Sequence, residues 1–87
     1  PEEALAQIAD PAPGPESQYS RQQQREALQQ ALAELPPAQR EVFLLREHAE
    51  LSLDEIGRLT GVSSETAKSR LRYAIARLAT ALAGRFA

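Results

Sequence analysis

The stretch SLDEIGRLTGVSSETAKSR, residues 52–70, decides the fold that we predict from this sequence. Ser52 followed three positions later by Glu55 is a capping box, in which the side chain of each residue accepts a hydrogen bond from the backbone N–H of the other at the start of a helix. Gly61 suits the left-handed conformation that commonly ends a helix. The stretch therefore predicts a short helix at residues 53–60, closed by a glycine turn.

A second helix start follows this turn at once. Ser63 offers another N-cap hydroxyl, and we expect a longer helix from Ser64 to about Leu82. A short capped helix, a glycine-containing turn and a longer capped helix form the pattern of a helix-turn-helix. Many helical corners share this pattern, so its function depends on what the longer helix exposes.

Two further helices are predicted upstream. Apolar residues at helical spacing predict one helix at 16–34 and another at about 38–48, separated by two prolines that stop the first. Residues 1–15 are interpreted as a linker or a frayed N-terminal segment, because three prolines lie close together at its end. The predicted fold is all-α: a four-helix domain at 16–87 that contains the helix-turn-helix.

The longer helix has one apolar side at about 100° per residue. The residues expected to face inward are Ala67, Leu71, Ala74, Ile75, Leu78 and Leu82. Opposite them lie Glu65, Ser69, Arg72, Tyr73 and Ala76, with Lys68 and Arg70 on the two flanks. On the shorter helix, Ile56 and Leu59 are expected to face inward.

Charge is distributed unevenly along the 87 residues, although the net charge is only -2. Residues 1–36 hold six acidic residues against two arginines, whereas the chain from Lys68 onward holds five basic residues and no acidic one. Local positive charge of this kind attracts phosphate, whatever the sum over the chain. On its own, such a run of charge is more often a solvated helix face.

The exposed side of the longer helix suits a DNA groove. Long cationic side chains can reach guanine edges or phosphates, and the small Ser69 allows close approach. Tyr73 offers a flat apolar ring and a hydroxyl to a thymine methyl or a phosphate. Hydroxyl groups crowd the helix start, where free backbone amides attract phosphate: Ser63, Ser64, Thr66 and Ser69. Ser63 serves equally well as a cap alone.

Composition excludes several classes of protein. The chain has no Cys, so it contains no disulfide and no thiolate metal site, and a cytoplasmic location fits. No apolar run is long enough for a membrane span, and no signal-peptide pattern is present. The sequence begins at Pro1 and contains no Met, so we expect a fragment of a longer protein.

Three spaced motifs carry a resemblance to a known family: LPPAQREVF at 35–43, LDEIG at 53–57 and TAKSRL at 66–71. Over roughly residues 20–82 the chain resembles region 4 of bacterial RNA polymerase sigma factors, and most of all the extracytoplasmic-function group. The resemblance implies a four-helix domain that recognises the −35 promoter element in double-stranded DNA. It also implies docking on the β-subunit flap of core RNA polymerase and occlusion by an anti-sigma factor.

The resemblance assigns roles to residues by position. It places at base-contacting sites Lys68, Ser69, Arg72 and Tyr73. It places at DNA-backbone sites Ser52, Leu53, Thr66 and Arg70. The hydroxyl cluster adds Ser63 and Ser64 to the backbone set, and Arg77 in the acid-free stretch is assigned there as well. The chain departs from the family at three positions: Gly57 stands where Ala is usual, Ala67 where Val is common, and Tyr73 where the residue is often basic.

Alternatives of other kinds remain open at this point. The output domain of a response regulator shares the four-helix layout and also binds DNA. A sigma mimic would bind an anti-sigma factor without touching DNA, but its basic face should then be eroded. No catalytic residue, metal site or cofactor is predicted, because His48 is the only histidine and no glycine-rich phosphate loop occurs.

Overall fold

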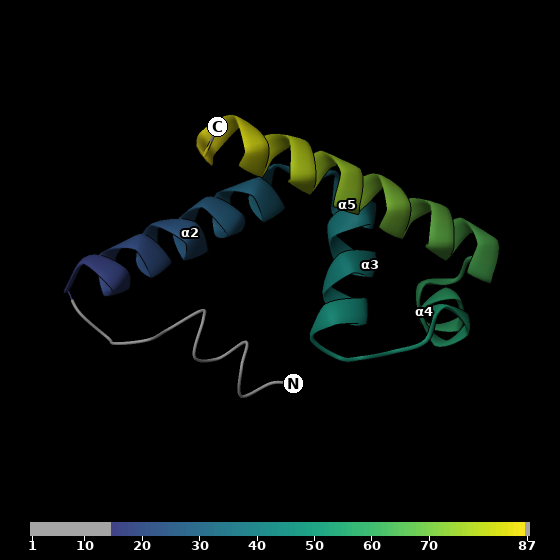
Figure 1. The fold of residues 1–87 in the computed structure, drawn as a ribbon. Coiled ribbons are helices and arrows are strands. Elements are labelled where there is room, and N and C mark those ends of the chain that lie inside the picture. Colours follow the sequence, from purple (N-terminus) through teal and green to yellow (C-terminus); the bar gives the residue numbers. More distant parts are fainter. Residues whose placement is uncertain (1–14, 87) are drawn as a thin grey trace, which may run out of the picture.

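The computed structural model describes residues 15–86, and the side chains of residues 18–84, as four helices. The helices are α2 (Pro15–Glu34), α3 (Pro37–Glu47), α4 (Leu53–Thr60) and α5 (Ser64–Phe86). Figure 1 shows α5 lying across the other three helices, with α2 and α3 diverging beneath it. The predicted all-α helix-turn-helix class is confirmed, although α5 extends about one turn beyond the expected end. The predicted N-terminal linker lies, apart from Pro15, outside the described residues.

The corner between α2 and α3 is fixed by prolines and by one arginine. Pro36 precedes the first residue of α3, and Pro37 occupies its first turn, where a missing N–H does no harm. Arg40 reaches back from α3 to the free carbonyls at the end of α2. Its Nε donates to the Leu32 oxygen at 3.1 Å and its Nη2 to the Leu35 oxygen at 3.1 Å. These bonds satisfy carbonyls that a helix C-terminus leaves without partners.

The chain between α3 and α4 turns through a left-handed residue. Glu50 has φ 55°, a conformation that non-glycine residues adopt uncommonly. The next residue is held by two bonds to α3: Leu51 N–H donates to the Leu45 oxygen at 3.2 Å, and Arg46 Nη1 donates to the Leu51 oxygen at 2.9 Å. Arg46 thus fixes the position from which α4 begins.

The helix-turn-helix forms by the predicted local interactions. Ser52 Oγ accepts from the Glu55 N–H at 3.1 Å, and the Glu55 carboxylate accepts from the Ser52 N–H at 2.8 Å, which completes the capping box. Gly61 ends α4 in the left-handed conformation, with φ 76°. Ser63 Oγ then accepts from the Thr66 N–H at 3.0 Å and caps the start of α5.

The core consists of two clusters joined by α5. One cluster packs Ala31 of α2 and Leu35, the residue after α2, against Ala74 and Leu78 of α5, with Leu32, Phe43, Ala81 and Leu82 partly buried around it. The other encloses Val42, Ile56 and Ala67, from α3, α4 and α5. Small side chains in both clusters let the helices approach closely. As a result, the first half of α5 is held by α3 and α4, and its second half by α2 and α3.

Two residues expected in the interior lie at the surface instead. Leu59 is 65% exposed, because α4 turns the side bearing Ile56 and Gly57 inward. Ile75 is 49% exposed, since it lies about 100° around the helix from the fully buried Ala74. Both predictions were wrong. Periodicity identified an apolar side on each helix but placed its centre too near these residues.

Gly57 explains which side of α4 faces inward. An added Cβ there would lie 2.7 Å from the Val62 backbone oxygen and 3.2 Å from Ser64 N. The turn therefore packs directly on the glycine, and α4 lies close against the chain entering α5. Within residues 15–86, no helix is both long and apolar enough to cross a membrane.

Candidate nucleic-acid interface

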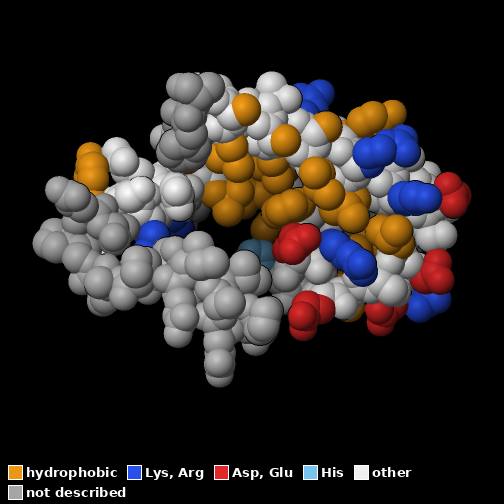
Figure 2. All heavy atoms as spheres, viewed as in Figure 1, with side chains coloured by type: hydrophobic (Ala, Val, Ile, Leu, Met, Phe, Trp, Pro, Cys, Tyr) orange, Lys and Arg blue, Asp and Glu red, His pale blue; other side chains and the backbone are white. Residues whose placement is uncertain are grey.

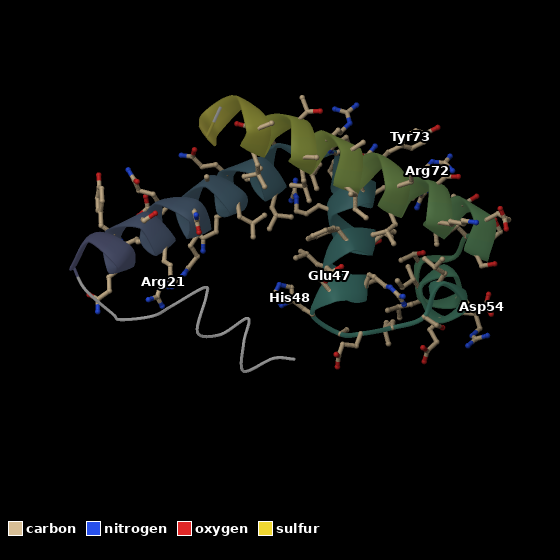
Figure 3. The ribbon with its side chains drawn as sticks, viewed as in Figure 1. Arg21, Glu47, His48, Asp54, Arg72 and Tyr73 are labelled. Carbon is tan, nitrogen blue, oxygen red and sulfur yellow. The ribbon has the colours of Figure 1, made fainter. Side chains whose placement is uncertain are left out.

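The first half of α5 presents four predicted base-contacting side chains to solvent. Lys68, Arg72 and Tyr73 are exposed, and Ser69 is half-buried. We call these four residues the reading face. In Figure 3, Arg72 and Tyr73 project from the side of α5 that faces away from α3. The reading face is thus held on a helix whose opposite side is fixed by Ala67 and Ala74, both fully buried.

The cations of α5 have no partner in the described part of the chain. No hydrogen bond or ion pair involves Lys68, Arg70, Arg72 or Arg77 among residues 18–84, apart from the contact of Arg72 with the Tyr73 ring. The arginines of α3 differ, because Arg40 and Arg46 donate to backbone carbonyls. The charge on α5 is therefore available to an external anion.

A hollow of about 350 Å³ lies where α4 and α5 begin. Its walls are formed by Arg46, Ser52, Leu53, Asp54, Ser64, Glu65 and Lys68. We call it the cap hollow. It brings together three of the predicted backbone-contacting residues, Ser52, Leu53 and Ser64, with the reading-face residue Lys68. Two helices begin at this hollow, and a helix start favours a phosphate, whereas the carboxylates of Asp54 and Glu65 on the same walls disfavour one.

Arg46 was missed by the sequence reasoning. It lines the cap hollow while one of its guanidinium nitrogens donates to the Leu51 oxygen. A basic residue in the last turn of α3 was visible in the sequence, but its ordinary interpretation is stabilisation of a helix C-terminus. Only the turn through Glu50, which brings α4 back beside α3, places Arg46 next to Ser52.

The hydroxyls at the start of α5 are partly committed to capping. Ser63 Oγ accepts from the Thr66 N–H and donates to Thr66 Oγ1 at 3.1 Å. The Ser63 hydroxyl is thus used within the chain. In this arrangement the Thr66 hydroxyl accepts from Ser63, so its own hydrogen is free to donate to a phosphate oxygen. Thr66 is the better placed of the two for an external contact.

The negative charge of Glu55 is also held within its capping box. The backbone N–H of Ser52 lowers the pKa of the Glu55 carboxyl below its ordinary value of 4.5, and the Ser52 side chain and Arg58 act in the same direction. Because the carboxylate folds back onto the start of α4, its charge is engaged by that helix terminus.

Arg70 and Arg77 lie apart from the reading face. Arg70 is half-buried, on the flank of α5 near its packed side, so only the end of its side chain can reach a DNA strand. Arg77 borders a different hollow between α2 and α5, together with Glu34 and Thr80. Arg77 is about 20 Å along the helix from Ser64, at 1.5 Å per residue. The structure does not bring Arg77 together with the other predicted backbone contacts.

Glu65 is an exposed acid among these cations and was not predicted as a contact. It lies in the first turn of α5, one turn before Lys68 and Ser69 on the same side of the helix. A carboxylate there disfavours phosphate, but it can accept a hydrogen bond from a cytosine amino group. Its position opposite the apolar side was the available signal, and we interpreted it only as part of the solvated face.

The two halves of α5 differ in what they expose. The helix has 23 residues and is about 34 Å long. Its first half carries the reading face. The second half is occupied by packing against α2. Figure 2 shows basic side chains over the end of the molecule where α5 begins, with acidic side chains among them.

Comparison with known families matches this arrangement. The family described as Sigma-70, region 4 matches residues 25–78. That range includes the second half of α2, the whole of α3 and α4, and the part of α5 that bears the reading face. Comparisons with curated proteins and with solved structures gave no match.

Proposed function

Because the chain belongs to the sigma-70 region 4 family, a family of DNA-binding regulatory domains that act with RNA polymerase, we propose that it reads the −35 element of promoters. We further propose that the parent protein is a sigma factor of the extracytoplasmic-function group and works in the cytoplasm. The observation that carries the proposal is the reading face: exposed cations that have no hydrogen bond or ion pair among residues 18–84, on a helix whose other side is packed.

Base recognition is assigned to the reading face. Arg72 and Lys68 can donate to guanine O6 and N7, and a bidentate arginine is the commonest specific contact of this kind. Ser69 is short enough to let the helix approach the base edges. The Tyr73 ring is available to a thymine methyl group.

The DNA backbone is assigned to the ends of α4 and α5. Ser52, Leu53 and Ser64 border the cap hollow, where two helices begin and where Arg46 and Lys68 offset the acidic Asp54 and Glu65. Thr66 and Arg70 would hold the strand on the other flank of α5. Ser63 is assigned a weaker contact with the DNA backbone, because its hydroxyl is already used in the helix cap. Arg77 could contact only a phosphate further along the duplex.

Binding to the polymerase is assigned to a separate, apolar surface of the domain. Figure 2 shows hydrophobic side chains gathered between α2 and α3, below α5. Leu32 and Phe43 are only partly buried there, and Leu28 is 37% exposed. We call this surface the apolar hollow. Amphipathic helices bind in such grooves, so we assign it to a helix of the β-subunit flap, and an anti-sigma factor would compete for it.

Selection of bound duplexes from a random library tests the proposal. The 87-residue chain is used alone and with core RNA polymerase, because tethering by the polymerase raises the effective concentration of a weak module. We expect one short motif to be enriched. Arg72→Ala should then weaken binding to that motif by about 1–3 kcal/mol and binding to unrelated DNA by less.

Arg25→Ala is the matched control, since it removes an exposed arginine from α2, away from the reading face. It should leave the enriched motif unchanged. No enrichment, with or without polymerase, would contradict the proposal. If that result came with tight binding to an anti-sigma factor, it would favour the sigma mimic. Neither the mimic nor a response-regulator output domain is favoured by the family match, nor by the cations of α5 that have no ion pair in the described part of the chain.

A further inference from the structure

Arg72 and Tyr73 are consecutive residues whose side chains meet on the exposed side of α5. The guanidinium carbon of Arg72 lies 5.4 Å from the centre of the Tyr73 ring, within the distance of about 6 Å for a cation–π contact. Figure 3 shows both side chains directed away from the packed side of α5. Tyr73 is 54% exposed, so the ring is held by its own helix and not by a surrounding core.

For this contact to form, the Arg72 side chain must bend toward the next residue of the helix. Consecutive residues on a helix point about 100° apart and do not normally face each other. Arg72 must therefore bend along the helix surface toward Tyr73. No hydrogen bond or ion pair involves Arg72 within residues 18–84. Among the described residues, the ring is thus the group that orients the guanidinium.

Ser69 leaves room beside the oriented guanidinium. It lies three residues before Arg72 and four before Tyr73, and residues at those spacings are neighbours on a helix surface. Its side chain is small and half-buried. A base edge can therefore approach Arg72 on the side where Tyr73 holds it. An arginine already bent into a contact geometry loses less conformational freedom when it binds.

We propose that Tyr73 is a positioning residue for Arg72, whose guanidinium it directs toward one base pair beside Ser69, and that Tyr73 thereby sharpens the preference for guanine at that pair. This inference rests on the proposed function. It adds that Tyr73 determines specificity through its neighbour, whatever contact its own ring makes with the DNA. A leucine at this position would keep apolar area but would not hold the cation.

A double-mutant cycle on the 87-residue chain tests the inference. Tyr73→Leu and Tyr73→Phe are each made with Arg72 present and with Arg72→Ala. Dissociation constants are measured for the selected duplex and for the same duplex with the guanine pair replaced by an adenine pair. We expect Tyr73→Leu to lower the guanine-to-adenine discrimination about 2- to 5-fold, as for an exposed cation–π contact. Tyr73→Phe should keep the discrimination of the parent chain, because the ring remains. In the Arg72→Ala background, neither Tyr73→Leu nor Tyr73→Phe should change the discrimination that is left.

Ile75→Ala is the control for general loss of exposed apolar area on α5, because Ile75 is exposed to a similar degree and lies outside the reading face. It should not alter the discrimination. In spectra of the free chain, the side-chain protons of Arg72 should also show a ring-current shift that disappears in Tyr73→Leu. That readout would not follow from a merely structural role of Tyr73.

Two results would overturn the inference while leaving the proposed function in place. One is an equal effect of Tyr73→Leu with and without Arg72, which would mean that the ring reads DNA independently. The other is the absence of the ring-current shift. A parent chain that prefers no sequence would contradict the proposed function, and the inference would fail with it.

Discussion

Gly57 shows how one residue sets the geometry of the reading helix. In the sequence it stands where the family usually has Ala, and glycine is about 1 kcal/mol less favourable than alanine in a helix. In the structure, the turn between α4 and α5 packs onto it, and a Cβ would lie 2.7 Å from the Val62 oxygen. Gly84, near the end of α5, has no such neighbour within 4 Å.

The two glycines therefore predict opposite effects of the same substitution. Gly84→Ala should leave the melting temperature unchanged or raise it, because it adds helix propensity in open space. Gly57→Ala should lower it, because a backbone oxygen must move to admit the methyl group. In a domain of this size, about 1 kcal/mol corresponds to roughly 4–8 °C. Thermal denaturation followed by circular dichroism measures both variants, and an equal rise for the two would refute the close approach at Gly57.

At the scale of the helix, α4 depends on its capping box for a defined start. The helix has only eight residues, too few to be stable without its caps and its packing. The hydrogen bonds from Ser52 lower the pKa of Glu55. The carboxylate form therefore contributes stability that is complete above the ordinary pKa of 4.5 and is lost as the pH falls through the lower pKa of the folded protein.

This linkage gives a prediction for acid conditions. Glu55→Gln keeps an acceptor in the capping box but does not titrate. The melting temperature of the parent chain should fall more steeply than that of Glu55→Gln as the pH is lowered from 7 to 3, with the difference arising below about pH 4.5. Parallel curves would show that the capping box contributes nothing to stability that depends on the charge of Glu55.

Helix ends were predictable from this sequence because their causes are local. The capping box, Gly61 and the proline pair each act within four residues along the chain, and the observed ends of α3 and α4 lie within one residue of the predicted ones. Helix faces were less predictable. Leu59 and Ile75 have the chemistry of core residues, but the close approach at Gly57 and the packing of Ala74 decide which side turns inward.

At the scale of the whole molecule, the structure separates two kinds of surface. The reading face lies at one end of α5, and the apolar hollow lies between α2 and α3, under the other half of that helix. The net charge of -2 conceals the cations of α5, which have no ion pair within residues 18–84, because local charge governs attraction to DNA. This separation would let one domain bind DNA and a polymerase helix at the same time.

The candidate site was predictable from the sequence only where its residues lie on a single helix. Exposure of Lys68, Arg72 and Tyr73 followed from the helical period alone. The cap hollow did not, because it joins the end of α3 to the starts of α4 and α5 through the left-handed turn at Glu50. No pattern within a single helix indicates that Arg46 lies near Ser64.

The most direct test maps the DNA-binding surface of the protein by the shifts of its backbone amide signals. Proton–nitrogen correlation spectra of the 87-residue chain are recorded while the selected duplex is added. The account predicts the largest shifts at residues 52–54 and 63–73, where α4 and α5 begin, and little change over 18–34. Shifts concentrated along α2 or in the apolar hollow, with the first half of α5 unaffected, would contradict it.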